Sequence, residues 1–139
     1  MKISNMSSKD FHVMIDLIND SYARLKTDFD LDSPITLKSI DSIMGLILKK
    51  YTDDLFEGEV ASEEIGALIG SLLIRRGWTW HLVDDCPTII SPRQSLCFSP
   101  AVYLILAMEH GSYKIVMSDL DDLASSKKVG EMLDITWIK

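Results

Sequence analysis

The stretch EEIGALIGSLLIRRGWTWHLVDD, residues 63–85, decides the fold because the period of its apolar residues changes inside it. The first half carries apolar side chains at helical spacing, with Gly66 and Gly70 one turn apart among them. After Gly77 the period becomes two, which is typical of a strand. We therefore expect a helix that ends near Gly77 and leads directly into a sheet.

The two glycines have a structural explanation. Each costs roughly 1 kcal/mol relative to alanine inside a helix, so close packing must offset that cost. A membrane dimer motif would need about 20 apolar residues, and a phosphate-binding loop would place its glycines between a strand and a helix. Neither context is present, so we expect Gly66 and Gly70 to let another helix or the sheet approach closely.

Periodicity and capping signals predict three helices up to Gly77. They cover residues 7–26, 37–55 and 62–76, and the acidic sequence FEGEVA, residues 56–61, is expected to be a loop. Ser7 with Asp10 forms a capping pattern for the first helix, and Ser62 is placed to cap the third.

A small antiparallel sheet with interleaved helices is expected after these three N-terminal helices. The predicted strands cover 78–83, 88–90, 95–98, 113–117 and 133–137, and the predicted helices cover 99–111 and 118–130. The chain shows no internal repeat or linker, so residues 1–139 are predicted to form a single α+β domain.

The charge of the chain restricts its partners. A net charge of -7 disfavours nucleic acid and anionic membrane surfaces, whereas it favours a basic protein partner. The first ten residues lack the apolar core of a signal peptide, and the longest apolar run, residues 101–108, is too short to cross a bilayer. A cytoplasmic protein without membrane contact is therefore expected.

Residues 81–86 hold the side chains best suited to chemistry. His81, Asp84, Asp85 and Cys86 are all of metal-ligand type, but the paired spacing of a zinc site is missing. A Cys86 nucleophile with His81 as base is a weak alternative. We expect no catalytic residue, no metal and no cofactor, and we expect Cys86 and Cys97 to be separate thiols.

Acidic side chains gather in patches that could meet a basic partner. Asp28, Asp30 and Asp32 begin like a calcium loop, but Ser33 and Ser39 stand where that loop needs glycine and glutamate. The candidate partner-binding residues are Asp28, Asp30, Asp32, Asp53, Asp54, Glu57, Glu59, Trp78, Asp84 and Asp85. A fourth patch comprises Asp119, Asp121 and Asp122, and each patch could instead be a solvated surface.

The pattern E-x-I-G-A-x-I-G followed by a tryptophan strand resembles a family of small uncharacterised bacterial domains. The matching positions are Ile65, Gly66, Ala67, Ile69, Gly70, Trp80 and Asp84. Ser71 departs from the family, which more often has an acidic residue there. The resemblance implies a fold and a bacterial origin, and small acidic bacterial proteins of this layout resemble immunity proteins that neutralise a sibling toxin.

These observations favour a non-enzymatic immunity protein that blocks a basic toxin domain by occlusion, acting as a monomer or a homodimer. One alternative is a structural or regulatory homodimeric module that associates through its tryptophan strand or a sheet edge. A second alternative is a small-ligand-binding protein or an enzyme that uses the region from His81 to Cys86.

Overall fold

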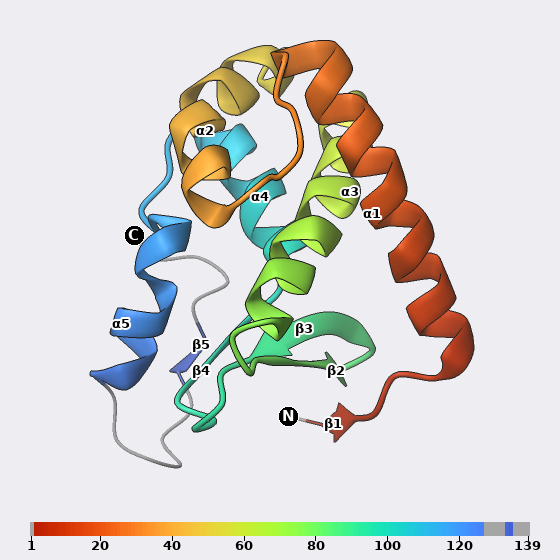
Figure 1. Ribbon diagram of the computed structural model, residues 1–139, viewed down its shortest axis with the longest axis vertical. Helices are drawn as coiled ribbons and strands as arrows, with labels where there is room; N and C mark the ends of the chain where they lie inside the picture. Colours follow the sequence, from red (N-terminus) through yellow and green to blue (C-terminus); the bar gives the residue numbers. More distant parts are fainter. Residues whose placement is uncertain (1, 127–132, 135–139) are drawn as a thin grey trace.

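The computed structural model describes residues 2–126, 133 and 134, and it confirms the predicted α+β class. The helices are α1 (Ser8–Phe29), α2 (Leu37–Tyr51), α3 (Leu55–Ile74), α4 (Pro100–His110) and α5 (Leu120–Ser125), with a 3-10 turn at Met117–Asp119. The strands are β1 (Ile3–Ser4), β2 (Thr79–Val83), β3 (Cys86–Ile90), β4 (Leu96–Phe98) and β5 (Leu133–Asp134). Helices α1 to α4 stand over the sheet (Figure 1).

The strands follow one another across the sheet in chain order. Pairs β2–β3 and β3–β4 are antiparallel, as predicted for the meander, and β1 adds a further antiparallel pair with β2. Strand β5 is parallel to β4, which differs from a wholly antiparallel sheet, and the predicted strand residues Ile135 and Trp137 lie outside the described residues. Strand β1 was not predicted, because two residues are too short to show a period.

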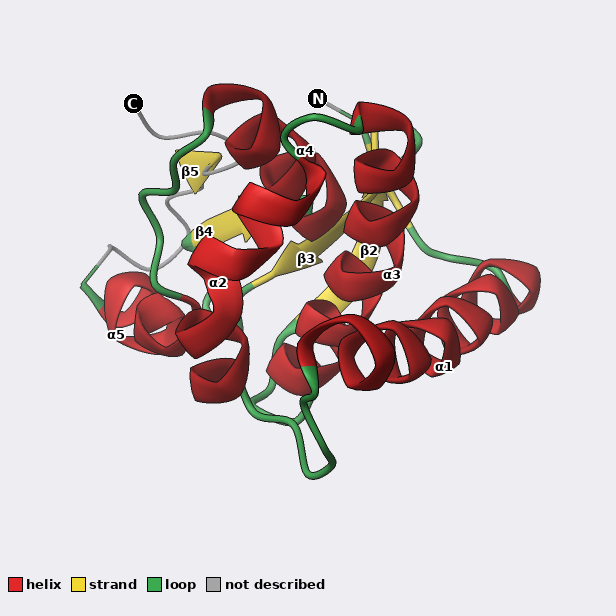
Figure 2. Ribbon diagram, turned by 90° about the horizontal axis from the view of Figure 1, so that it is seen from above, coloured by secondary structure: helices red, strands yellow, loops and turns green. Residues whose placement is uncertain are grey.

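Helix α3 is the centre of the domain. It has 20 residues, and 12 of them are buried, so only a narrow stripe of the helix reaches the surface. Helices α1 and α4 pack along its sides, and the strands run beneath it (Figure 2). The position of α3 therefore fixes how the other helices meet the sheet.

The two glycines of α3 allow the close approach that the sequence predicted. A Cβ atom at Gly66 would lie 2.7 Å from the backbone nitrogen of Ala101, at the start of α4. A Cβ atom at Gly70 would lie 1.9 Å from Cζ2 of the Trp80 ring on β2. Any larger residue at either position would push α3 away from its neighbours.

The boundary between the second and third helices was predicted wrongly. Residues 56–61 are helical and not a loop, because the Asp54 side chain caps α3 by accepting the Glu57 N–H at 3.2 Å. Ser62 is buried inside the helix, where its hydroxyl donates to the Gly58 carbonyl at 2.7 Å. Met108 and Tyr51 pack directly against Gly58 inside this helix.

The strand expected over residues 113–117 is absent, because side chains take up its backbone N–H groups. The Tyr103 hydroxyl accepts from Lys114 and Ile115 at 3.0 and 2.9 Å. The Asp41 carboxylate accepts from Met117 and Ser118 at 2.7 and 2.9 Å. The helix expected over 118–130 is shorter, and its expected C-terminal end at residues 127–130 lies outside the described residues.

Replacement of Gly66 or Gly70 by alanine is expected to lower the free energy of unfolding by about 1–3 kcal/mol, since the added methyl group overpacks the contact. Gly45→Ala in α2 is the matched control, because a Cβ there meets nothing within 4 Å. It should stabilise the protein by roughly 0.5–1 kcal/mol through helix propensity alone. Urea unfolding measures all three variants, and equal effects at the three positions would contradict close packing.

Candidate functional site

Two acidic patches of the sequence come together at the end of the helical layer that lies away from the sheet (Figure 1). One patch is the C-terminal end of α1 and the residues after it, and the other is the connection from α2 to α3 with the first turns of α3. We call this region the acidic end. It comprises Asp28, Asp30, Asp32, Asp53, Asp54, Glu57 and Glu59.

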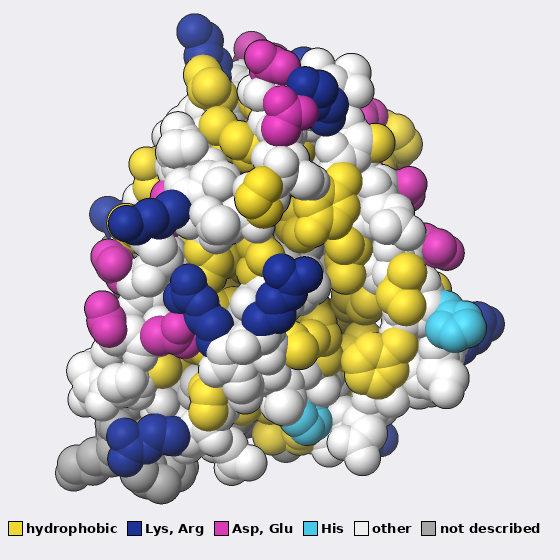
Figure 3. All heavy atoms as spheres, in the orientation of Figure 1, with side chains coloured by type: hydrophobic (Ala, Val, Ile, Leu, Met, Phe, Trp, Pro, Cys, Tyr) yellow, Lys and Arg dark blue, Asp and Glu magenta, His cyan; other side chains and the backbone are white. Residues whose placement is uncertain are grey.

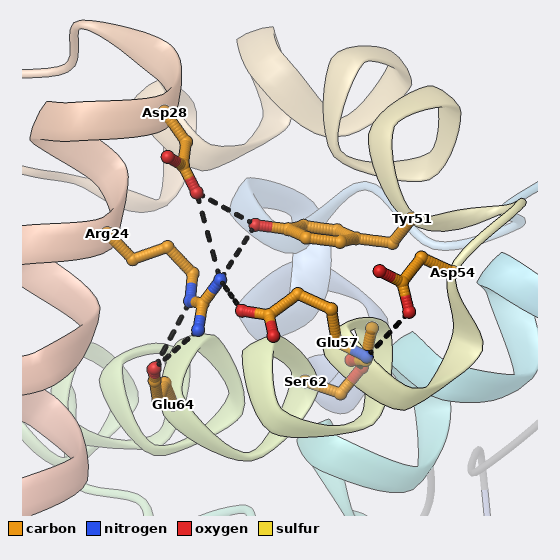
Figure 4. Close-up of polar contacts among 8 residues, drawn as sticks. Arg24, Asp28, Tyr51, Asp54, Glu57, Ser62 and Glu64 are labelled. Atoms are coloured by element: carbon orange, nitrogen blue, oxygen red, sulfur yellow. Dashed lines mark hydrogen bonds and ion pairs between the residues drawn. The ribbon is translucent and has the colours of Figure 1, made fainter.

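Arg24, on α1, joins the two patches by ion pairs within α1 and to α3 and by a hydrogen bond to α2 (Figure 4). Its guanidinium lies 2.7 Å from Glu57, 3.0 Å from Glu64 and 3.7 Å from Asp28. The Tyr51 hydroxyl, on α2, accepts from Arg24 and donates to Asp28, both at 3.2 Å. One guanidinium among three carboxylates leaves a local net charge of -2.

Burial and hydrogen bonding have opposite effects on the pKa of Arg24. Burial disfavours the charged guanidinium, but the hydrogen bonds to Glu64, Tyr51 and Glu57 outweigh it, so the pKa of Arg24 is raised above its ordinary value. Burial also raises the pKa of the Tyr51 hydroxyl. Arg24 therefore stays a cation and Tyr51 stays a neutral phenol at neutral pH, and the contacts persist.

The Arg24 side chain is 14% exposed and the Glu64 side chain 7% exposed, so this pair lies beneath the surface. Of the described residues, none leaves a buried side-chain nitrogen or oxygen without a hydrogen-bond partner. Arg24 is accordingly a structural link between helices, and it holds the outer carboxylates in place.

The outer part of the acidic end keeps charge that is available to a partner. Lys26 forms ion pairs with Asp30 at 3.2 Å and with Asp32 at 2.8 Å, but all three side chains are exposed and such pairs are screened by water. Within the part of the chain that the structure describes, Asp53 and Glu59 form no ion pair.

Basic side chains moderate this charge without cancelling it. Lys49 and Lys50 lie in the last turn of α2, next to the acidic end, so acidic and basic groups mix there (Figure 3). With Arg24 and Lys26 they make four basic side chains against the seven carboxylates of the acidic end. The region therefore remains negative.

Phe56 is a surface residue of this region that the sequence analysis did not identify. Its side chain is 78% exposed, the largest value among the large hydrophobic residues described. It lies in the first turn of α3, between Asp54 and Glu57. The sequence does place Phe56 and Val60 four residues apart, which is the spacing of one helix face. This pattern was not used, because the segment was predicted to be a loop.

Asp84 and Asp85 lie near the sheet and do not join the acidic end. They form the two-residue turn between β2 and β3, with φ angles of 49° and 66°. The backbone of Lys2 donates to the Asp84 carboxylate at 2.9 Å, and the Asp84 N–H donates to the Lys2 carbonyl at 2.8 Å. Asp84 therefore anchors the N-terminal strand.

Trp78 was expected at a partner surface, but its side chain is only 1% exposed. Its indole N–H donates to the Asp121 carboxylate at 2.7 Å, and Arg76 pairs with the same carboxylate at 2.9 Å. A side chain at this depth offers no surface to a partner, so Trp78 is not part of the surface proposed below.

The region from His81 to Cys86 forms a hairpin. The register places His81 opposite Thr88 and Cys86 opposite Val83. Among residues 2–126, 133 and 134, no group of three or more His, Cys, Asp or Glu side chains is arranged to hold a metal ion. No disulfide joins Cys86 and Cys97, as expected, and Cys97 is buried whereas Cys86 is half-buried.

The chain matches no protein-family model, no curated protein and no solved structure. Of the helices that the structure describes, none is long and apolar enough to cross a membrane. The resemblance to small bacterial domains therefore stays a prediction.

Arg24→Met is expected to lower the free energy of unfolding by about 3 kcal/mol or more, because Glu64 is left as a buried carboxylate without its cation. The double variant Arg24→Met/Glu64→Leu should recover most of that loss, since no buried charge remains. Lys26→Met is the control on the same helix, where two exposed ion pairs are removed and little should change. Chemical denaturation distinguishes these outcomes, and equal losses for Arg24→Met and Lys26→Met would contradict a structural role for Arg24.

Proposed function

We propose that this chain is a cytoplasmic, non-enzymatic binding protein of the immunity type, which neutralises a basic toxin domain by covering it. The observation that carries the proposal is the convergence of two acidic patches at the acidic end, beside the exposed ring of Phe56. An excess of carboxylates attracts a basic protein and speeds its encounter, and a rigid aromatic side chain supplies contact area once the proteins meet.

The ion pairs of Arg24 support this reading because they prearrange the surface. Asp28 belongs to α1, and Glu57 belongs to α3, yet both are held by the same guanidinium. A surface that is already ordered loses less conformational entropy when a partner binds. The same helix that carries Glu57 also carries Phe56, so the aromatic anchor is fixed relative to the charges.

The first test is whether a partner exists. The purified chain should retain the product of the neighbouring gene in a pull-down, and the complex should weaken steeply as salt is raised. Absence of a toxin-like neighbour and of any retained partner would refute the immunity proposal. Light scattering of the chain alone tests the homodimeric alternative, which a stable dimer without any ligand would favour.

The second test assigns the surface. Asp53→Lys is expected to slow association with the partner, because it reverses a charge of the acidic end that no described residue neutralises by an ion pair. Phe56→Ala should weaken binding by about tenfold or more, mainly through faster dissociation, as for a buried aromatic anchor. Glu109→Lys, at the exposed end of α4, is the charge control. Stopped-flow association rates check these values, and an equal effect of Asp53→Lys and Glu109→Lys would indicate unspecific attraction.

A further inference from the structure

An apolar groove runs beside α3, with α1 and the start of α4 as its walls. Its volume is about 320 Å3, and its lining includes Val13, Leu17, Ala67, Trp80, Val102 and Glu63. We call it the α1–α4 groove. Small residues of α3, Gly66 and Ala67, lie along it, so little side-chain bulk fills the space between the two walls.

The groove continues toward the acidic end. A second hollow of about 130 Å3 shares Glu63, Ala101 and Val102 with it and extends to Glu59. Phe56, Val60, Glu63 and Ala67 follow one another at spacings of four, three and four residues, which places them on one face of α3. At 1.5 Å per residue this stripe is about 16 Å long, or about three helical turns.

The exposed apolar area extends beyond the two hollows. Val13 is 50% exposed on the wall formed by α1, and both Phe56 and Val60 are exposed on α3. A small ligand would occupy only the groove, whereas an elongated apolar partner would cover the stripe as well.

The negative charge of the residues that line the groove favours a positively charged occupant. Glu63 lines both the groove and the second hollow, Glu59 lines the second hollow alone, and neither forms an ion pair within the described part of the chain. The residues that line the two hollows include no Lys, Arg or His. An apolar occupant flanked by cations would complement this lining, and an acidic occupant would be repelled.

From the groove and its charge we infer that the α1–α4 groove receives the apolar face of a basic amphipathic helix, supplied by the partner protein. The inference rests on the proposed function and names the part of the partner that docks. Leucine-type side chains would enter the groove beside Ala67 and Trp80, and Lys or Arg side chains would meet Glu63 and Glu59.

Cys86 provides a reporter for occupancy, because it lines the groove and is half-buried, whereas Cys97 is buried. The probe is a helical leucine–lysine peptide of about 18 residues, roughly five turns, with one apolar face. It should slow the reaction of Cys86 with Ellman's reagent about tenfold at saturation, and the matching leucine–glutamate peptide should not. The Cys86→Ser variant shows which part of the signal belongs to Cys86.

Two variants test whether protection comes from the groove. Val13→Lys places a cation on the groove wall and should abolish protection, whereas Ile15→Lys, on the same helix and 54% exposed, lies outside the lining and should leave it unchanged. Glu63→Lys should weaken protection at least tenfold, with Glu109→Lys as its control. Absence of protection, or equal protection of Val13→Lys and Ile15→Lys, would overturn the inference.

The partner complex separates this inference from the proposed function. If both hold, Asp53→Lys slows association and Val13→Lys weakens the complex. Loss of binding with Asp53→Lys but normal binding with Val13→Lys would leave the proposed function intact and overturn the groove as its docking site. If no protein partner is found, the proposed function fails, and the peptide assay on Cys86 still decides whether the groove binds a basic helix.

Discussion

The contact of α3 with α4 and β2 is the constraint on which the rest of the structure depends. Gly66 brings the backbone of α3 against Ala101, and Gly70 receives the ring of Trp80. Both contacts occur on one helix, one turn apart, so α3 is fixed against a helix and the sheet at once. A helix held this closely has most of its surface buried, and its remaining exposed face becomes the feature available to other molecules.

The surface proposed for binding follows from this arrangement. Since α3 begins at Leu55, its first turn carries Phe56 and Glu57 to the acidic end. Arg24 then links α1 to α3 through Glu57 and Glu64, beneath the exposed carboxylates. A fixed core therefore sets the spacing between an apolar stripe and a set of charges, although none of those exposed groups contributes to the core.

The sequence was sufficient for the features that depend on local signals. The α+β class, the capping box at Ser7 and the role of the glycines follow from periodicity and from the steric needs of close packing. Residues 56–61 were predicted as a loop but are helical, and their glycine, Gly58, serves close packing against Met108 and Tyr51, contacts that local sequence signals do not show. Residues 113–117 were wrongly predicted as a strand, because N–H groups in this segment bond to the side chains of Tyr103 and Asp41, which are distant in sequence.

At the candidate site, too, the sequence predicts some features of the charge distribution and not others. Clustering of acidic residues is visible in sequence, but their neutralisation is not, because Arg24 reaches Glu64 across 40 positions. The structure divides the carboxylates into those that hold helices together, such as Glu64, and those that form no ion pair with any other described residue, such as Asp53 and Glu59. Only unpaired exposed charges can attract a partner over distance without first losing an internal contact. Glu59 lies on α3 at the hollow that continues the apolar groove. The residue that attracts a basic partner and the surface that would bind its apolar side chains therefore lie next to each other on one helix.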